Sequence, residues 1–205
     1  MSSRFRFACI LAAGLLACSD DGPAGPSPGD QRDEALLNIL RLAATSPPLW
    51  NPEVTFWAKQ GQGAEIGIYF QDPQGQKGEK FVELDLDGES LLEYPDGTPF
   101  TPGDSVLITM RVVDATKLLV EFEPAGLRFN PVKPAQLEFR YQFADDDFNE
   151  DGTVDTSDDQ IELILGIWRQ ATPGAPFVRL GTLRIEQLEE LDADLLGFSR
   201  FAIAY

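Results

Sequence analysis

Strict alternation of apolar and polar residues dominates the chain from residue 53 onward. Residues 54–58 read Val-Thr-Phe-Trp-Ala and residues 82–86 read Val-Glu-Leu-Asp-Leu, so every second side chain, beginning with the valine, is apolar. A period of two places the apolar side chains on one face of a β-strand and leaves the other face to water. The pattern predicts strands over residues 54–58, 66–70, 82–86, 106–112, 118–122 and 137–143.

Turn-forming residues separate these segments, and the pattern continues to the end of the chain. Gly, Pro and Asp gather between the predicted strands, as at 71–75 and 95–98. Residues 164–170 and 177–183 flank a Pro- and Gly-rich turn and predict a late hairpin, and two apolar runs follow within 188–205. We therefore expect an all-β fold, an antiparallel β-sandwich of one or two β-modules.

One segment before the strands has a helical pattern. Within residues 33–44, Leu36, Leu40 and Ala43 fall on one face of a helix, and Asp30 can serve as the N-cap. Two prolines end the segment at 47–48. We expect a short N-terminal helix that packs across one end of the sandwich.

The first eighteen residues resemble the export signal of a bacterial lipoprotein. A cationic start is followed by an apolar run, residues 7–16, which is shorter than the ~20 residues that a membrane-spanning helix needs. The sequence Leu15-Leu16-Ala17-Cys18 resembles the lipobox, which implies cleavage before Cys18 and lipid on its sulfur. Ordinary cleavage near Ala17 is the alternative.

The lipobox implies how the chain is divided and where it is located. Residues 1–17 are the predicted signal peptide, and residues 18–34, rich in Pro, Gly, Ser and Asp, are a predicted flexible tether. The protein is then exported and held by its lipid at the cell envelope, on the outer membrane at its periplasmic or surface face. The membrane is thus its first expected partner.

Composition excludes several classes of function. The chain has 34 acidic and 16 basic residues, and removal of residues 1–17 takes away two arginines and no acid, so the mature charge is 14 minus 34, or −20. Such a surface repels nucleic acid and attracts divalent cations. There is no His, and the only cysteines are Cys9 and Cys18, which excludes His-based triads and a thiol nucleophile in the mature domain. We expect no enzymatic activity.

The acidic segment 147–158 has the spacing of a calcium-binding loop. Calcium prefers six to eight oxygen ligands, which one loop supplies from its positions 1, 3, 5, 7, 9 and 12. Gly152 stands at position 6, where the chain must bend, and Val154 at position 8 is expected to point into the core. The predicted ligands are Asp147, Asn149, Asp151, Thr153 through its carbonyl, Asp155 and Asp158.

The loop resembles that of EF-hands and, more closely, that of bacterial dockerin modules. It shares the D-x-N-x-D-G-x-V run, and it has Asp158 where EF-hands usually have Glu. Dockerins carry two such loops, so one loop does not imply cohesin binding. A chance acidic turn is the alternative. Because eight carboxylates within 145–159 would repel one another without a cation, we expect Ca²⁺ here, with a Kd of roughly 10⁻⁴–10⁻³ M.

The segment after the loop fits two structures. Residues 161, 164, 165 and 168 form one face of a helix, whereas residues 161, 163, 165 and 167 alternate as in a strand. The pattern before the loop is that of a strand, so a standard helix–loop–helix hand is not expected.

Two further motifs resemble the ZU-type β-domain of ankyrins and netrin receptors and its relatives in bacterial lipoproteins. Residues 126–131 (GLRFNP) match the start of that domain, and residues 197–204 (GFSRFAIA) match its closing strand, with Gly197 and Phe201 at positions where the family has His and Tyr. The resemblance covers about residues 120–205 and implies a β-sandwich used for protein contacts or as a spacer, without enzymatic activity. Residues 35–119 would be a partner β-module or the earlier strands of one enlarged sandwich.

Three functions compete at this point. The first is a non-enzymatic binding or scaffold domain, stabilised by calcium, with an envelope protein as its partner. The second is a carbohydrate-binding module that stacks a glycan on Trp50, Trp57 or Trp168. The third is a two-carboxylate hydrolase, which needs a cleft with carboxyl groups about 5–9.5 Å apart.

Overall fold

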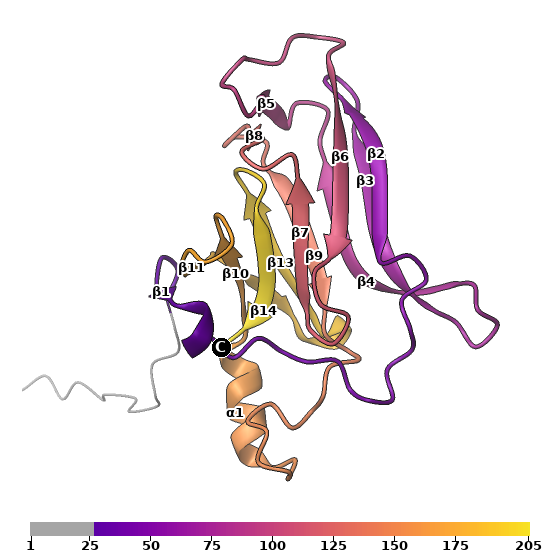
Figure 1. The fold of residues 1–205 in the computed structure, drawn as a ribbon, viewed down its shortest axis with the longest axis vertical. Helices are drawn as coiled ribbons and strands as arrows, with labels where there is room; N and C mark the ends of the chain where they lie inside the picture. Colours follow the sequence, from indigo (N-terminus) through magenta and orange to yellow (C-terminus); the bar gives the residue numbers. More distant parts are fainter. Residues whose placement is uncertain (1–26) are drawn as a thin grey trace, which may run out of the picture.

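The computed structural model describes residues 27–205 and shows two antiparallel sheets packed face to face (Figure 1). The seven-stranded sheet contains, in spatial order, β1 (Gln31–Arg32), β11 (Phe177–Arg179), β10 (Gly166–Gln170), β14 (Arg200–Ala204), β7 (Leu119–Glu123), β6 (Ser105–Val112) and β2 (Glu53–Lys59). The five-stranded sheet contains β12 (Leu183–Ile185), β13 (Glu190–Leu195), β9 (Ala135–Arg140), β4 (Lys77–Leu86) and β3 (Ala64–Gln71). The predicted all-β sandwich is confirmed.

A few short elements complete the fold. Strands β5 (Leu91–Glu93) and β8 (Arg128–Phe129) form a two-stranded sheet of their own. The helix α1 (Thr156–Ile164) has nine residues, and single 3-10 turns lie at Glu34–Leu36 and Glu186–Leu188. None of the helices in the described part of the chain is long and apolar enough to cross a membrane.

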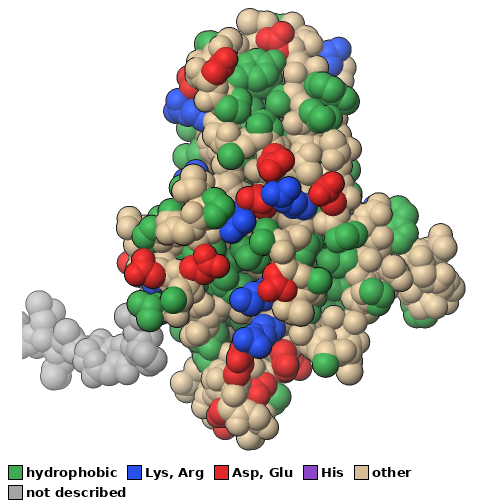
Figure 2. All heavy atoms as spheres, viewed as in Figure 1, with side chains coloured by type: hydrophobic (Ala, Val, Ile, Leu, Met, Phe, Trp, Pro, Cys, Tyr) green, Lys and Arg blue, Asp and Glu red, His purple; other side chains and the backbone are tan. Residues whose placement is uncertain are grey.

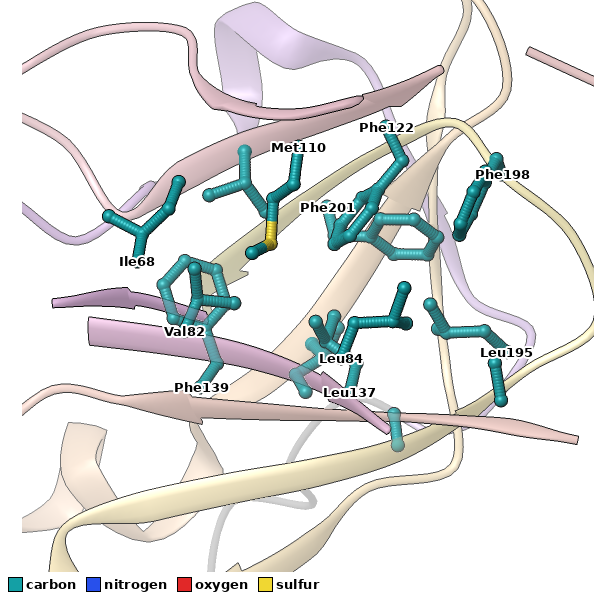
Figure 3. Close-up of a cluster of buried hydrophobic side chains, with 14 of the residues drawn as sticks. Ile68, Val82, Leu84, Met110, Phe122, Leu137, Phe139, Leu195, Phe198 and Phe201 are labelled. Carbon is teal, nitrogen blue, oxygen red and sulfur yellow. The ribbon is translucent and has the colours of Figure 1, made fainter. Parts of the chain in front are cut away.

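The core lies between the two sheets and is built from the apolar positions of the alternating segments (Figure 3). Met110, Phe122 and Phe201 extend from the seven-stranded sheet toward Val82 and Phe139 of the other sheet. The rings of Phe122 and Phe201 meet edge to face at 5.7 Å, a favourable aromatic geometry.

Strands from both halves of the chain contribute to both sheets. In the seven-stranded sheet β7 lies between β6 and β14, and in the five-stranded sheet β9 lies between β4 and β13. One continuous cluster of buried side chains includes residues from 40 to 203. This interleaving is the arrangement of the enlarged single sandwich, one of the two alternatives that the sequence left open for residues 35–119.

The helix predicted over 33–44 is reduced to the 3-10 turn at Glu34–Leu36, and the rest of the segment is extended. The Leu40 N–H donates to the Ile203 carbonyl at 2.9 Å, and the Leu42 N–H donates to the Thr116 carbonyl at 2.9 Å. These long-range bonds use the backbone groups that a helix would pair internally. Asp30 does not cap a helix; its carboxylate accepts from the Ser27 N–H at 2.7 Å. We call residues 29–43 the strap.

The strap covers part of the outer face of the seven-stranded sheet. Leu37 is 7% exposed and packs there in a second hydrophobic cluster with Trp168, Phe177 and Ala202. Strand β14 is therefore buried on both faces, with Phe201 and Ile203 in the main core and Ala202 beneath the strap. The sandwich thus has a partial third layer.

The segment after the acidic loop adopts both structures that its pattern allowed. Helix α1 ends at Ile164, and β10 begins two residues later at Gly166. Strands β10 and β11 pair antiparallel, so the predicted late hairpin is confirmed. The strand predicted to reach residue 143 ends at Arg140, because the Ala144 N–H closes a turn onto the Tyr141 carbonyl at 2.7 Å.

The two motifs that resemble a ZU-type domain lie against each other. The Phe198 N–H donates to the Leu127 carbonyl at 3.0 Å, and the rings of Phe129 and Phe198 meet edge to face at 4.9 Å. A Cβ on Gly197 would lie 2.8 Å from the Leu127 carbonyl oxygen, so the contact requires glycine at that position.

Candidate functional site

The acidic loop connects the end of the five-stranded sheet's central strand, β9, to α1 at one end of the sandwich (Figure 1). In the space-filling view, acidic side chains gather at this same end of the molecule (Figure 2). Helix α1 is fixed to the sandwich by Glu162, whose carboxylate accepts from the Tyr141 hydroxyl at 2.9 Å and pairs with Arg184 at 2.6 Å. The loop is therefore supported by the sheets on one side and by a fixed helix on the other.

The first half of the loop folds around the N–H groups of its own bend. Both carboxylate oxygens of Asp147 accept backbone bonds, one from Asp151 at 3.1 Å and one from Gly152 at 2.8 Å. The side-chain oxygen of Asn149 accepts from the same Asp151 N–H at 2.9 Å. Gly152 has φ of +88°, the left-handed region that glycine adopts without strain. The side chains at positions 1 and 3 thus converge on the bend at positions 5 and 6.

The middle of the loop is open to water. The Asp151 carboxylate accepts from the Thr153 N–H at 2.9 Å and from the Asn149 side-chain amide at 3.1 Å. Val154, expected in the core, is 64% exposed, and that prediction was wrong. Residues 151–157 are all exposed and the chain at position 8 continues directly into the helix cap at Asp155, so the valine side chain remains outside the core.

The last part of the loop forms the N-terminal cap of α1. The Asp155 carboxylate accepts from the Ser157 N–H at 2.7 Å, and Asp158 completes a capping box by accepting from the Asp155 N–H at 2.9 Å. The second carboxylate oxygen of Asp158 accepts from the Asn149 N–H at 3.2 Å, and the residue is only 2% exposed. The bond from the Asp155 N–H is the main reason why the pKa of Asp158 is lowered.

The six predicted ligands therefore lie on one closed turn, but the five that would bind through side chains already accept hydrogen bonds from backbone N–H groups. Within residues 27–205, no group of three or more Asp, Glu, Cys or His side chains is arranged as a ready metal cage. The backbone has the bend and the exit helix that a calcium loop needs. Calcium binding would require Asp147, Asn149 and Asp151 to exchange backbone hydrogen bonds for the ion. The seventh-position carbonyl, of Thr153, follows the bend directly.

The loop also contacts the strap and the C-terminus. Arg41 of the strap forms an ion pair with Glu150 at 2.9 Å, and its carbonyl accepts from the Asp145 N–H at 2.8 Å. The Tyr205 hydroxyl donates to the Phe148 carbonyl at 2.7 Å. These residues border a polar cleft of about 500 Å³ between the strap and the loop.

A second charged group, which the sequence reasoning missed, lies on the five-stranded sheet. Lys80 forms ion pairs with Glu83 at 3.0 Å, Glu190 at 3.4 Å and, at closer range, Glu138. Asp192 lies directly opposite Glu138 in the sheet. Burial, with the nearby charges of Glu190 and Glu138, raises the pKa of Asp192 to about 6. Alternation places the four carboxylates on the polar face of their strands, but it would place Lys80 on the core face of β4. A register shift between β3 and β4 at this point brings Lys80 to the polar side, and nothing in the sequence indicates that shift.

The tryptophans that could stack on a glycan are distributed unequally. Trp168 is fully buried, and its indole N–H donates to the Ala204 carbonyl at 3.0 Å. Trp57 is 67% exposed on β2, and Trp50 is 42% exposed. Only the latter two could contact a ligand in solution.

No family model, curated protein or solved structure matches this chain. The fold and the loop therefore define only a class, an antiparallel β-sandwich that carries an acidic, helix-capping loop at one end. Cys18, the predicted lipid attachment site, lies outside the described residues, as does the predicted signal peptide.

Proposed function

We propose that this protein is an exported lipoprotein whose β-sandwich is a non-enzymatic binding or scaffold domain, stabilised by calcium at residues 147–158. One observation carries the calcium part. The side chains at positions 1 and 3 of the loop converge on the N–H groups of its bend, and α1 begins at position 10 behind a capping residue at position 9. The bend and the helix after it are those of a loop with EF-hand spacing, and the side chains at positions 1, 3 and 5 would turn from the N–H groups to the ion.

The electrostatics of the loop also support a cation. Two like charges 4 Å apart repel by roughly 1 kcal/mol in water and more near a protein surface. Residues 145–159 carry eight carboxylates, and the one cationic side chain that pairs with the loop among residues 27–205 is Arg41. A doubly charged ion would reduce this repulsion and stabilise the folded loop over the unfolded one.

The anchor and the scaffold role rest on the sequence. The resemblance of residues 15–18 to a lipobox supports a location at the envelope, and the resemblance of two motifs to a ZU-type domain supports protein contacts rather than catalysis. The partner we propose is an envelope protein, and the net charge of −18 argues against nucleic acid.

The test is the melting temperature of the protein with and without calcium. For a Kd of roughly 1 mM, 10 mM calcium would stabilise the fold by RT ln(1 + [L]/Kd), about 1.4 kcal/mol, or about 3–6 °C. The variant Asp147→Asn/Asp151→Asn removes two charges but keeps the shape of the side chains, and we expect it to lose this shift.

Asp72→Asn is the matched control, because Asp72 also accepts two backbone bonds in an exposed turn, from Gln74 and Gln76. It should keep the full calcium shift. The calcium proposal is wrong if the wild-type protein shows no shift, or if the double variant shifts as much as Asp72→Asn.

A further inference from the structure

The strand β2 forms a long, unprotected border of the seven-stranded sheet. It pairs with β6 on one side only, whereas the opposite border of that sheet, β1, has two residues (Figure 1). In the other sheet, β12 has three residues, and β3 is partly covered by residues 48–50, since the Trp50 N–H donates to the Tyr69 carbonyl at 2.8 Å. An open edge of seven residues is a template for pairing with another strand.

The hydrogen-bonding pattern shows which residues of β2 can pair outward. The Val112 N–H donates to the Pro52 carbonyl and the Gln60 N–H to the Asp104 carbonyl, both at 2.9 Å. In an antiparallel pair, hydrogen-bonded and non-bonded positions alternate, so the even-numbered residues of β2 use their backbone groups on β6. The odd-numbered residues direct theirs to the open edge. These are Glu53, Thr55, Trp57 and Lys59, and the Lys59 carbonyl there also accepts from the Gln62 N–H at 3.1 Å.

The sequence of β2 is complementary to itself in one register of this edge. Residues 53–59 read Glu-Val-Thr-Phe-Trp-Ala-Lys. When two copies pair antiparallel about Phe56, Glu53 of each copy lies opposite Lys59 of the other, and Thr55 lies opposite Trp57. All four of these positions are odd-numbered, so the register that pairs the opposite charges is also one that the free backbone groups allow.

Pairing at this edge would cover apolar side chains that are exposed in the single chain. Trp57 is 67% exposed, and Leu107, its cross-strand neighbour on β6, is 44% exposed. Val54 and Phe56 point into the core yet remain partly exposed at the border. Because directly opposite residues share a face, pairing would place the core sides of both copies on the same side of one continuous sheet.

We propose that β2 is a homodimerisation strand, where two copies of this chain join edge to edge about Phe56 with Glu53 of each against Lys59 of the other. A two-fold axis at Phe56 makes both halves of the contact identical, as an isologous interface requires. The contact is short, so the dimer forms in a concentration-dependent manner.

A zero-length carbodiimide cross-link tests this register on the full chain in detergent micelles. The reagent joins a carboxylate to an amine only when the two are in contact. Six residues of one extended strand span roughly 20 Å, so Glu53 and Lys59 of the same chain cannot be joined. We expect mass spectrometry of a mixed ¹⁴N and ¹⁵N sample to find the Glu53–Lys59 cross-link in mixed-isotope form, increasing with protein concentration.

Charge exchange provides the matched variants. Glu53→Lys and Lys59→Glu each place like charges opposite one another at two symmetric points, and we expect each to reduce the dimer fraction in sedimentation velocity at least fivefold. The double variant Glu53→Lys/Lys59→Glu restores the pairs and should restore the dimer. The proposal is overturned if no mixed-isotope cross-link forms, if the single variants dimerise like the wild type, if the double variant stays monomeric, or if Lys59 is cross-linked in membranes to another protein instead.

Discussion

Replacing Leu37 by alanine would test whether the strap stabilises the fold. The Leu37 side chain is 7% exposed and contacts Trp168, Phe177 and Ala202 on the outer face of the sheet. The change removes three carbon groups, worth about 0.8 kcal/mol each, and leaves a space that the extended strap can close only in part. We expect a loss of about 2–4 kcal/mol and, for a domain of this size, a decrease of roughly 5–12 °C in melting temperature.

The neighbouring residue provides the control. Leu36 is 69% exposed at the end of the 3-10 turn, so Leu36→Ala should change the stability by less than about 0.5 kcal/mol. If residues 33–44 formed a helix, Leu36 would lie on its buried face and the order of the two effects would be reversed. Thermal melts of both variants, with limited proteolysis of the strap, measure the difference. Equal losses, or a larger loss for Leu36→Ala, would refute the extended strap.

Two other predictions concern charge and location. The folded-state pKa of Asp192, about 6, lies above its ordinary value of 3.8, so the stability that its protonated form provides is present below pH ~4 and lost as the pH rises through 6. Asp192→Asn should therefore raise the stability by about 1 kcal/mol at pH 8 and change it little at pH 4, and melts of both proteins across this pH range would show a constant difference if the reasoning is wrong. Cys18→Ala should release the protein from the membrane fraction or leave it unprocessed, and a mutant with wild-type mature mass and full membrane retention would contradict the lipobox.

The strands could be predicted because a strand with one face in the core and the other in water has apolar and polar residues in alternation. Each segment with a period of two overlaps a strand of the structure, and segments such as 54–58 and 106–112 lie wholly within one. This pattern is local, because it depends only on which side chains of that one strand face the core. The order of the strands is not local, and nothing in residues 118–122 indicates that β7 lies between β6 and β14.

The strap could not be predicted for the same reason. Leu36, Leu40 and Ala43 recur at helical spacing, but the backbone of this segment is paired with residues that follow it by more than 70 positions. Its hydrogen bonds to Thr116 and Ile203 exist only after the sheet has formed. Strand β14 is buried on both faces because the strap covers its outer face. In the sequence, the only indication of this burial is that both faces of the strand are apolar. Tertiary pairing here overrides a helical pattern of moderate strength.

The acidic loop lies between these two cases. Its bend is local, so the spacing of Asp147, Gly152 and Asp155 was enough to predict a closed turn, whereas the pattern after the turn fitted a helix and a strand equally well. The direction of Val154 is not local, because it depends on how the whole loop lies against the sandwich, and residues 151–157 all lie exposed. The cluster of carboxylates around Lys80 could not be recognised in the sequence, because Glu83, Glu138 and Asp192 come together only through the register of three strands. A candidate site made by one loop can thus be recognised in a sequence, whereas a cluster of charges made across a sheet requires the fold.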